Sequence, residues 1–136
     1  MLKQETTHLI SLSLIDYKTV EYLMTVDRHR IKEVILFYCQ QASEKALKAY
    51  LTEHNIDFKW IHDLTKLLAS CKSVSKAFSN DKLYIYCSYL TPFAVITRYG
   101  SGRIINKFTM DDVHKAVRAM KRICNAVFKE LDVNIN

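Results

Sequence analysis

Hydrophobic residues recur at helical spacing along most of this chain, and the longest such stretch runs from Ile31 to His54. It contains neither glycine nor proline, and strong helix formers fill its second half. Two apolar rows lie on different sides of the expected helix: Ile31, Val34, Ile35, Tyr38, Ala42 and Ala49 form one, and Leu36, Phe37, Leu47 and Leu51 form the other. A helix that is apolar on two sides packs between neighbours, so we expect residues 31–54 to form the central helix of a bundle.

A helix is predicted on each side of this central element. The one before it covers about residues 8–26, and Asp16 lies at the boundary of its apolar stripe. The one after it is short and begins near His62 or Asp63, because a carboxylate there meets the positive end of the helix dipole. The loop between them contains Trp60, which we expect to pack against the bundle.

Two more helices are predicted in the second half of the chain. Residues 81–98 contain enough β-branched and aromatic residues for a strand, but their length and the helical pattern around them favour a helix, which Pro92 would kink. The last helix follows Thr109, which forms a variant of the capping box with the acidic residues after it, and extends to Leu131. The sequence therefore predicts an all-α fold: an antiparallel up-and-down bundle of four long helices plus a short one, in a single domain over residues 1–136.

Composition adds a basic excess and four thiols to this picture. The formal net charge of +6 favours contact with phosphates or nucleic acid, although many soluble proteins carry such an excess. The four cysteines are widely spaced in apolar stretches, so we expect buried thiols in a reduced, cytoplasmic protein. No stretch approaches the ~20 apolar residues of a membrane span, and no secretory signal is evident, so no membrane contact is expected.

The sequence lacks the common motifs of cofactor, metal and nucleophile sites. Its two glycines, Gly100 and Gly102, form no phosphate-binding loop, and no two of the five histidines lie one helical turn apart. We therefore expect no cofactor and no metal.

Three fragments in a fixed order resemble one family of small helical proteins. The first is FYCQQASEKALKAYL at residues 37–51, the second is His62-Asp63-Leu64, and the third is Thr97-Arg98-Tyr99-Gly100. Together they resemble the HEPN domain family, whose members are often found beside minimal nucleotidyltransferases in bacteria and archaea. The resemblance spans residues 9–131 and departs from the family at Gly100, where proline is usual.

The resemblance implies a binding protein rather than an enzyme. HEPN proteins that cleave RNA carry an arginine followed four to six residues later by a histidine, and no arginine of this chain has that spacing. We therefore expect no catalytic residues, and a protein that binds a nucleotide or RNA, a nucleotidyltransferase partner, or both. Many members pair through a two-fold interface, and the central and last helices carry much apolar surface, so a homodimer is expected. An RNase toxin of a toxin–antitoxin pair with a degenerate motif, and a purely structural interaction module, stay open as alternatives.

The candidate nucleotide site lies between the expected second and fourth helices. Its predicted residues are Gln41, Glu44, Lys45, Lys48, His62, Arg98 and Tyr99. The three cations would meet phosphate oxygens, whereas Gln41 and Tyr99 would contact a base or a sugar. In the alternative, Glu44 and the two lysines neutralise one another as an internal network, and Arg98 is a buried partner of Glu44 or Asp16.

The last helix also carries a basic face, formed by Lys115, Arg118, Lys121, Arg122 and Lys129. Such a face is usually solvated. Single-strand nucleic-acid binders add exposed aromatic side chains between their cations, and this face lacks them.

Overall fold

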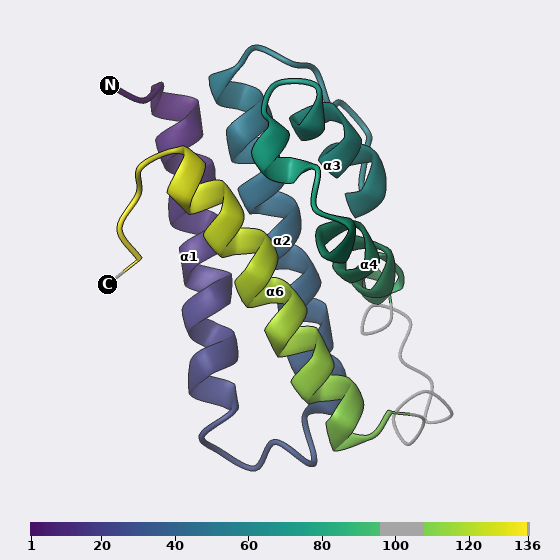
Figure 1. The fold of residues 1–136 in the computed structure, drawn as a ribbon. Coiled ribbons are helices and arrows are strands. Elements are labelled where there is room, and N and C mark those ends of the chain that lie inside the picture. The colour runs from purple at the N-terminus through teal and green to yellow at the C-terminus, as the bar shows by residue number, and fades with distance from the viewer. Residues whose placement is uncertain (96–107, 136) are drawn as a thin grey trace.

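The computed structural model describes residues 1–95 and 108–135. Within these ranges, five α-helices and two short 3₁₀ helices form a bundle without a strand. They are α1 (Gln4–Leu23), α2 (Lys32–Glu53), α3 (Leu64–Lys72), η1 (Lys76–Phe78), α4 (Asp81–Leu90), η2 (Thr91–Ala94) and α6 (Met110–Glu130). In Figure 1, α1 and α4 run in the opposite direction to α2 and α6, so the predicted all-α, antiparallel bundle is confirmed.

The α2 helix is the centre of this bundle. It packs against α1, α3, α4 and α6, and buried side chains surround most of its circumference. Those that are fully withdrawn from water are Ile35, Leu36, Cys39, Gln40, Ala42, Ser43, Ala46, Leu47, Ala49 and Leu51. Burial of apolar surface, at roughly 25 cal/mol per Å², therefore holds the bundle together mainly through this helix. The prediction of a central helix is confirmed, although Val34 of the predicted apolar row is exposed.

The predicted apolar stripe of α6 is buried at every position: Val113, Ala116, Met120, Ile123, Val127 and Leu131. Its start is fixed by a capping box, in which the Thr109 side chain accepts from the backbone of Asp112 and the Asp112 carboxylate accepts from the backbone of Thr109. The apolar surface of α2 and α6 is thus used inside the bundle. Apart from Val34, the large apolar side chains that stay exposed on the described α-helices lie on α1 and α4: Ile15, Tyr22, Tyr84 and Ile85.

The fourth predicted helix is shorter than expected. The α4 helix ends at Leu90, and the chain continues as the 3₁₀ helix η2, which contains Pro92. Proline removes a backbone donor and crowds the preceding turn, which explains the change of helix type. Residues 81–95 contain no strand, and residues 96–98 of the expected helix lie outside the described residues.

Two expectations for single residues are wrong. Trp60 does not pack against the bundle, because it is 83% exposed. Its φ of 67° places it in the left-handed region, and its neighbours Ile56, Phe58 and Ile61 contact the core in its place. Asp16 is buried, at 5% exposure, and does not lie at the boundary of the apolar stripe of α1. It is tolerated there because Lys45 from α2 neutralises it.

Candidate functional site

Polar side chains meet around Glu44 in the middle of the central helix. Glu44 accepts a hydrogen bond from Gln40 on one carboxylate oxygen, over 2.9 Å, and from Lys48 on the other, over 3.0 Å. The second oxygen also lies 3.2 Å from Nδ1 of His62, and Gln41 donates to the side-chain oxygen of Gln40 over 2.6 Å. We call these five residues (Gln40, Gln41, Glu44, Lys48 and His62) the Glu44 network.

The network is buried at one end and open at the other. Gln40 is fully buried and Glu44 is 7% exposed, whereas the side chain of His62 is 65% exposed. Gln40, Glu44 and Lys48 are spaced one helical turn apart, so α2 itself aligns them on one face. Lys48 lies between the two ends, and its Nζ is 5.4 Å from the centre of the Phe58 ring. The arrangement connects a neutralised buried carboxylate to a surface histidine.

The start of α3 positions His62. Asp63 caps this helix by accepting from the backbone N–H of Thr65 over 2.9 Å and from its hydroxyl over 2.7 Å. The hydrogen bonds from Thr65 lower the pKa of the Asp63 carboxyl, so the cap stays ionised. The backbone N–H of Leu64, the residue after Asp63, donates to the hydroxyl oxygen of Thr91 at the end of α4. His62 is therefore attached to a segment that both α3 and α4 hold.

Lys45 belongs to a different ion pair. Its Nζ lies 2.5 Å from a carboxylate oxygen of Asp16, and the pair connects α1 to α2. Among the described residues each predicted lysine thus has its own carboxylate, Asp16 for Lys45 and Glu44 for Lys48. This geometry supports the internal network of the alternative interpretation, with Asp16 in place of Glu44 as the partner of Lys45.

Arg98 and Tyr99 lie outside the described residues. The structure thus places Gln41, Glu44, Lys48 and His62 together and Lys45 in the pair with Asp16. Gln40 completes the network, and sequence reasoning did not name it as a site residue. Its signal was a polar side chain between the two apolar rows of the central helix, one turn before Glu44.

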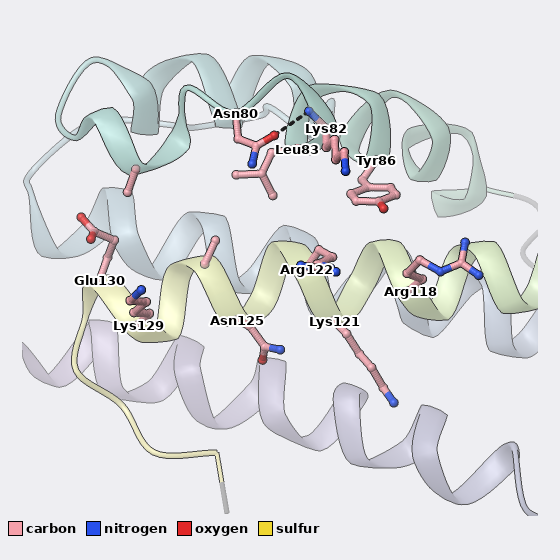
Figure 2. A pocket seen from close by; sticks show the side chains of 12 residues that line it. Asn80, Lys82, Leu83, Tyr86, Arg118, Lys121, Arg122, Asn125, Lys129 and Glu130 are labelled. Atoms are coloured by element: carbon pink, nitrogen blue, oxygen red, sulfur yellow. Dashed lines mark hydrogen bonds between the residues drawn. The ribbon is translucent and has the colours of Figure 1, made fainter.

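A groove between α4 and α6 is a second polar feature (Figure 2). It has a volume of about 690 Å³, and both helices line it with polar and basic side chains. The basic lining residues on α6 belong to the basic face noted in the sequence: Arg118, Lys121, Arg122 and Lys129. Those on the opposite wall, Asn80, Lys82 and Tyr86, were not recognised as site residues, because only the fold brings them to α6.

The four cysteines offer no reactive thiol. All are free and buried, and burial raises the pKa of Cys71 and of Cys124 to about 12 and that of the other two thiols as well. In the described ranges, no group of three or more histidine, cysteine, aspartate or glutamate side chains could hold a metal ion. No helix within those ranges is long and apolar enough to cross a membrane.

Comparison with known proteins places this fold in one family. The HEPN domain family matches residues 9–131, so the chain belongs to the HEPN domain family. Among solved structures, the crystal structure of ST0689, an archaeal HEPN homologue, matches with a TM-score of 0.75 and 20% sequence identity. The match covers 95% of this chain and 99% of that one, which shows a common fold. No curated protein matches the chain.

Proposed function

We propose that this HEPN domain protein is a non-catalytic binding protein that holds a nucleotide at the exposed end of the Glu44 network. The observation that carries the proposal is the buried pair of Gln40 and Glu44 inside the central helix. Apolar residues at such positions are often as stabilising as a buried ionic group, or more so. A polar network that crosses from the core to an exposed histidine therefore fits a binding site better than a device for stability.

The geometry suggests how a nucleotide would be held. Lys48 uses one of its three N–H donors on Glu44, which leaves two for phosphate oxygens. His62 and Gln41 lie at the outer edge, where an imidazole and an amide suit hydrogen bonds to a base or a sugar. Arg98 and Tyr99 stay predicted members of this site. Lys45 belongs to the separate ion pair with Asp16 and is not a member of the Glu44 network.

The non-catalytic part of the proposal rests on the sequence. No arginine precedes a histidine by the spacing that RNA-cleaving HEPN proteins use. The sequence therefore lacks the arginine–histidine pair that would transfer a proton and stabilise the phosphate during cleavage. A homodimer and a nucleotidyltransferase partner stay predictions from the family resemblance. Light scattering at tens of micromolar protein tests the homodimer, and co-purification of native protein tests the partner.

The proposal is tested by calorimetric titration of the protein with AMP and ATP. His62→Ala removes an exposed contact and is expected to weaken binding by about 1 kcal/mol, or roughly fivefold, with an unchanged melting temperature. Lys18→Ala on α1 is the matched control, because it removes an exposed side chain whose ion pair, in the part of the chain that the structure describes, is with Glu21. Absence of saturable binding contradicts the proposal, and so does equal affinity in wild type and His62→Ala. RNA cleavage by the pure protein contradicts its non-catalytic part.

A further inference from the structure

Side-chain contacts link α6 to the opposite wall near each end of the groove between α4 and α6. At one end, the Tyr89 hydroxyl donates to the backbone carbonyl of Asp112 over 3.0 Å, and Lys115 lies 4.3 Å from the centre of the Tyr89 ring. At the other end, the Ser75 hydroxyl donates to Glu130 over 2.7 Å. Buried Leu83 and the small side chains of Ala77 and Ala126 lie among the lining residues between these contacts. We call this feature the α4–α6 groove.

Positive charge dominates the α4–α6 groove. Its lining includes five cations: Lys82, Arg118, Lys121, Arg122 and Lys129. None of the five makes an ion pair with a carboxylate of the described chain. Glu130 is the one carboxylate among the described lining residues, and its hydrogen bond to Ser75 holds it at the end of the groove. Such an excess of one sign in a concave site attracts an anionic ligand.

Side chains from α4 extend across the groove toward the basic side chains of α6 (Figure 2). Figure 2 shows Lys82 and Tyr86 extending from α4 toward α6, where Arg118 and Arg122 lie, whereas Lys121 points away from α4. On α4, Tyr86 comes one turn after Lys82, so the lysine and the aromatic ring share one face. The aromatic group that the basic face of α6 lacks by itself is therefore supplied by the neighbouring helix.

The dimensions and the charge pattern select among anionic ligands. From Arg118 to Lys129 the basic stripe of α6 is about 16 Å long at 1.5 Å per residue, longer than the phosphate of one nucleotide. A nucleic-acid strand brings one charge with every nucleotide, whatever its sequence, and arginine matches phosphate oxygens in pairs. Tyr86 offers a ring on which an unpaired base can stack. An acidic protein segment would need several carboxylates close together and has no use for that ring.

We infer that the α4–α6 groove binds the phosphate backbone of a single-stranded nucleic acid without reading its base sequence. Phosphates lie along Arg118, Arg122 and Lys129 on one wall and Lys82 on the other, and one base stacks on Tyr86. This site shares no residue with the Glu44 network, so it can be present whether or not a nucleotide binds there.

The test is fluorescence anisotropy of the full-length protein with labelled 12-nucleotide oligo(U) and oligo(dT). Both probes are expected to bind, with a log–log slope of affinity against salt of about −2 to −3, as for three or four neutralised phosphates. The double variant Arg118→Glu/Arg122→Glu should weaken binding more than about tenfold, and Tyr86→Leu about fivefold. Lys18→Glu is the matched control, since it changes the charge of an exposed α1 residue outside the groove and should leave affinity within about twofold.

Three results overturn the inference. One is the absence of binding by either oligonucleotide at low salt. Another is equal affinity in wild type and in an Arg118→Glu/Arg122→Glu protein whose circular dichroism spectrum is native. The third is a labelled poly-L-glutamate peptide that binds as tightly as oligo(U) and loses affinity in the same double variant, which would assign the groove to an acidic protein segment. Mononucleotide affinity should be unchanged in the double variant, because the Glu44 network shares no residue with this groove.

Discussion

Lys48 donates a hydrogen bond over 3.0 Å to Glu44, which lies one turn earlier on α2, and the two side chains are 14% and 9% exposed. The pair lies on the central helix, where Gln40 and His62 complete the hydrogen bonding of the carboxylate. A buried charge is tolerated only when it is paired and hydrogen-bonded, so these side chains depend on one another. The ion pair of Lys48 and Glu44 therefore affects both the stability of the bundle and the geometry of the proposed nucleotide site.

Removal of one member of this pair should destabilise the protein strongly. Lys48→Met leaves the Glu44 carboxylate without its cation, and we expect a loss of about 3 kcal/mol in the free energy of unfolding. The double variant Glu44→Leu/Lys48→Met should recover most of that loss, because it removes both charges. Urea unfolding gives the free energy of unfolding of the wild type, the single variant and the double variant. A loss below about 1 kcal/mol in Lys48→Met would show that the pair is solvated in the way of a surface salt bridge.

The cap of α3 should make stability depend on pH in the acid range. The hydrogen bonds from Thr65 lower the pKa of Asp63 in the folded state, so the unfolded chain takes up the proton first as pH falls. The contribution of Asp63 is therefore complete above the ordinary aspartate pKa of about 3.9 and is lost as pH falls through the lower folded value. Asp63→Ala should lose about 1 kcal/mol at neutral pH, the usual value for an N-cap.

Thermal unfolding of wild type and Asp63→Ala at several pH values measures this effect. The difference between the two melting temperatures should shrink as pH falls below about 4, where Asp63 of the unfolded chain begins to bind a proton that the folded cap still excludes. Asp57→Ala is the control, because Asp57 is exposed in the loop before α3 and accepts a hydrogen bond from the backbone N–H of Lys59. A difference that stays constant over the whole acid range would show that the cap acts without its charge.

The thiols should be inert in the folded protein. Burial raises the pKa of Cys71 and of Cys124 to about 12, and that of Cys39 and of Cys87 as well, so few thiolates exist near neutral pH. We expect a thiol-reactive dye to label the native protein very slowly at about pH 8 and to label all four cysteines in guanidinium. Fast labelling of any native cysteine would contradict the buried positions that the structure gives them.

Arg98 lies outside the described residues, yet its role can be tested by one variant. If Arg98 contacts the nucleotide, Arg98→Ala should weaken binding by about 1.5–3 kcal/mol, the range for a charged hydrogen bond, and leave the melting temperature unchanged. Asp16 and Glu44, the structural partners that the sequence suggested for Arg98, each already pair with a lysine. Normal nucleotide affinity with a sharply lower melting temperature would instead make Arg98 a structural residue.

The sequence predicted the elements whose signal is periodic. The apolar rows of residues 31–54 and the stripe from Val113 to Leu131 reported the centre of the bundle and its last helix, because burial on a helix repeats every turn. The exposure of Trp60 was not predicted, because it depends on a left-handed backbone conformation in a loop without periodicity. Local sequence could not reveal that conformation.

The candidate site shows the same division. Glu44 and Lys48 lie on one helix, so their spacing alone brought them together. The pairing of Lys45 with Asp16 and the approach of Tyr86 to α6 depend on how separate helices pack. The spacing of residues along the sequence does not predict such contacts. Gln40 was visible as a polar residue between apolar rows, but its burial became evident only when four neighbouring helices covered α2.

The most direct test of the central claim is an NMR titration with AMP and ATP that follows the His62 imidazole and the Gln41 side-chain amide. The account predicts saturable chemical-shift changes at both groups with a common dissociation constant, which His62→Ala weakens while the fold stays intact. Saturable binding that shifts only the groove residues Arg118, Arg122 and Tyr86 would contradict the account, and so would no shift at millimolar nucleotide.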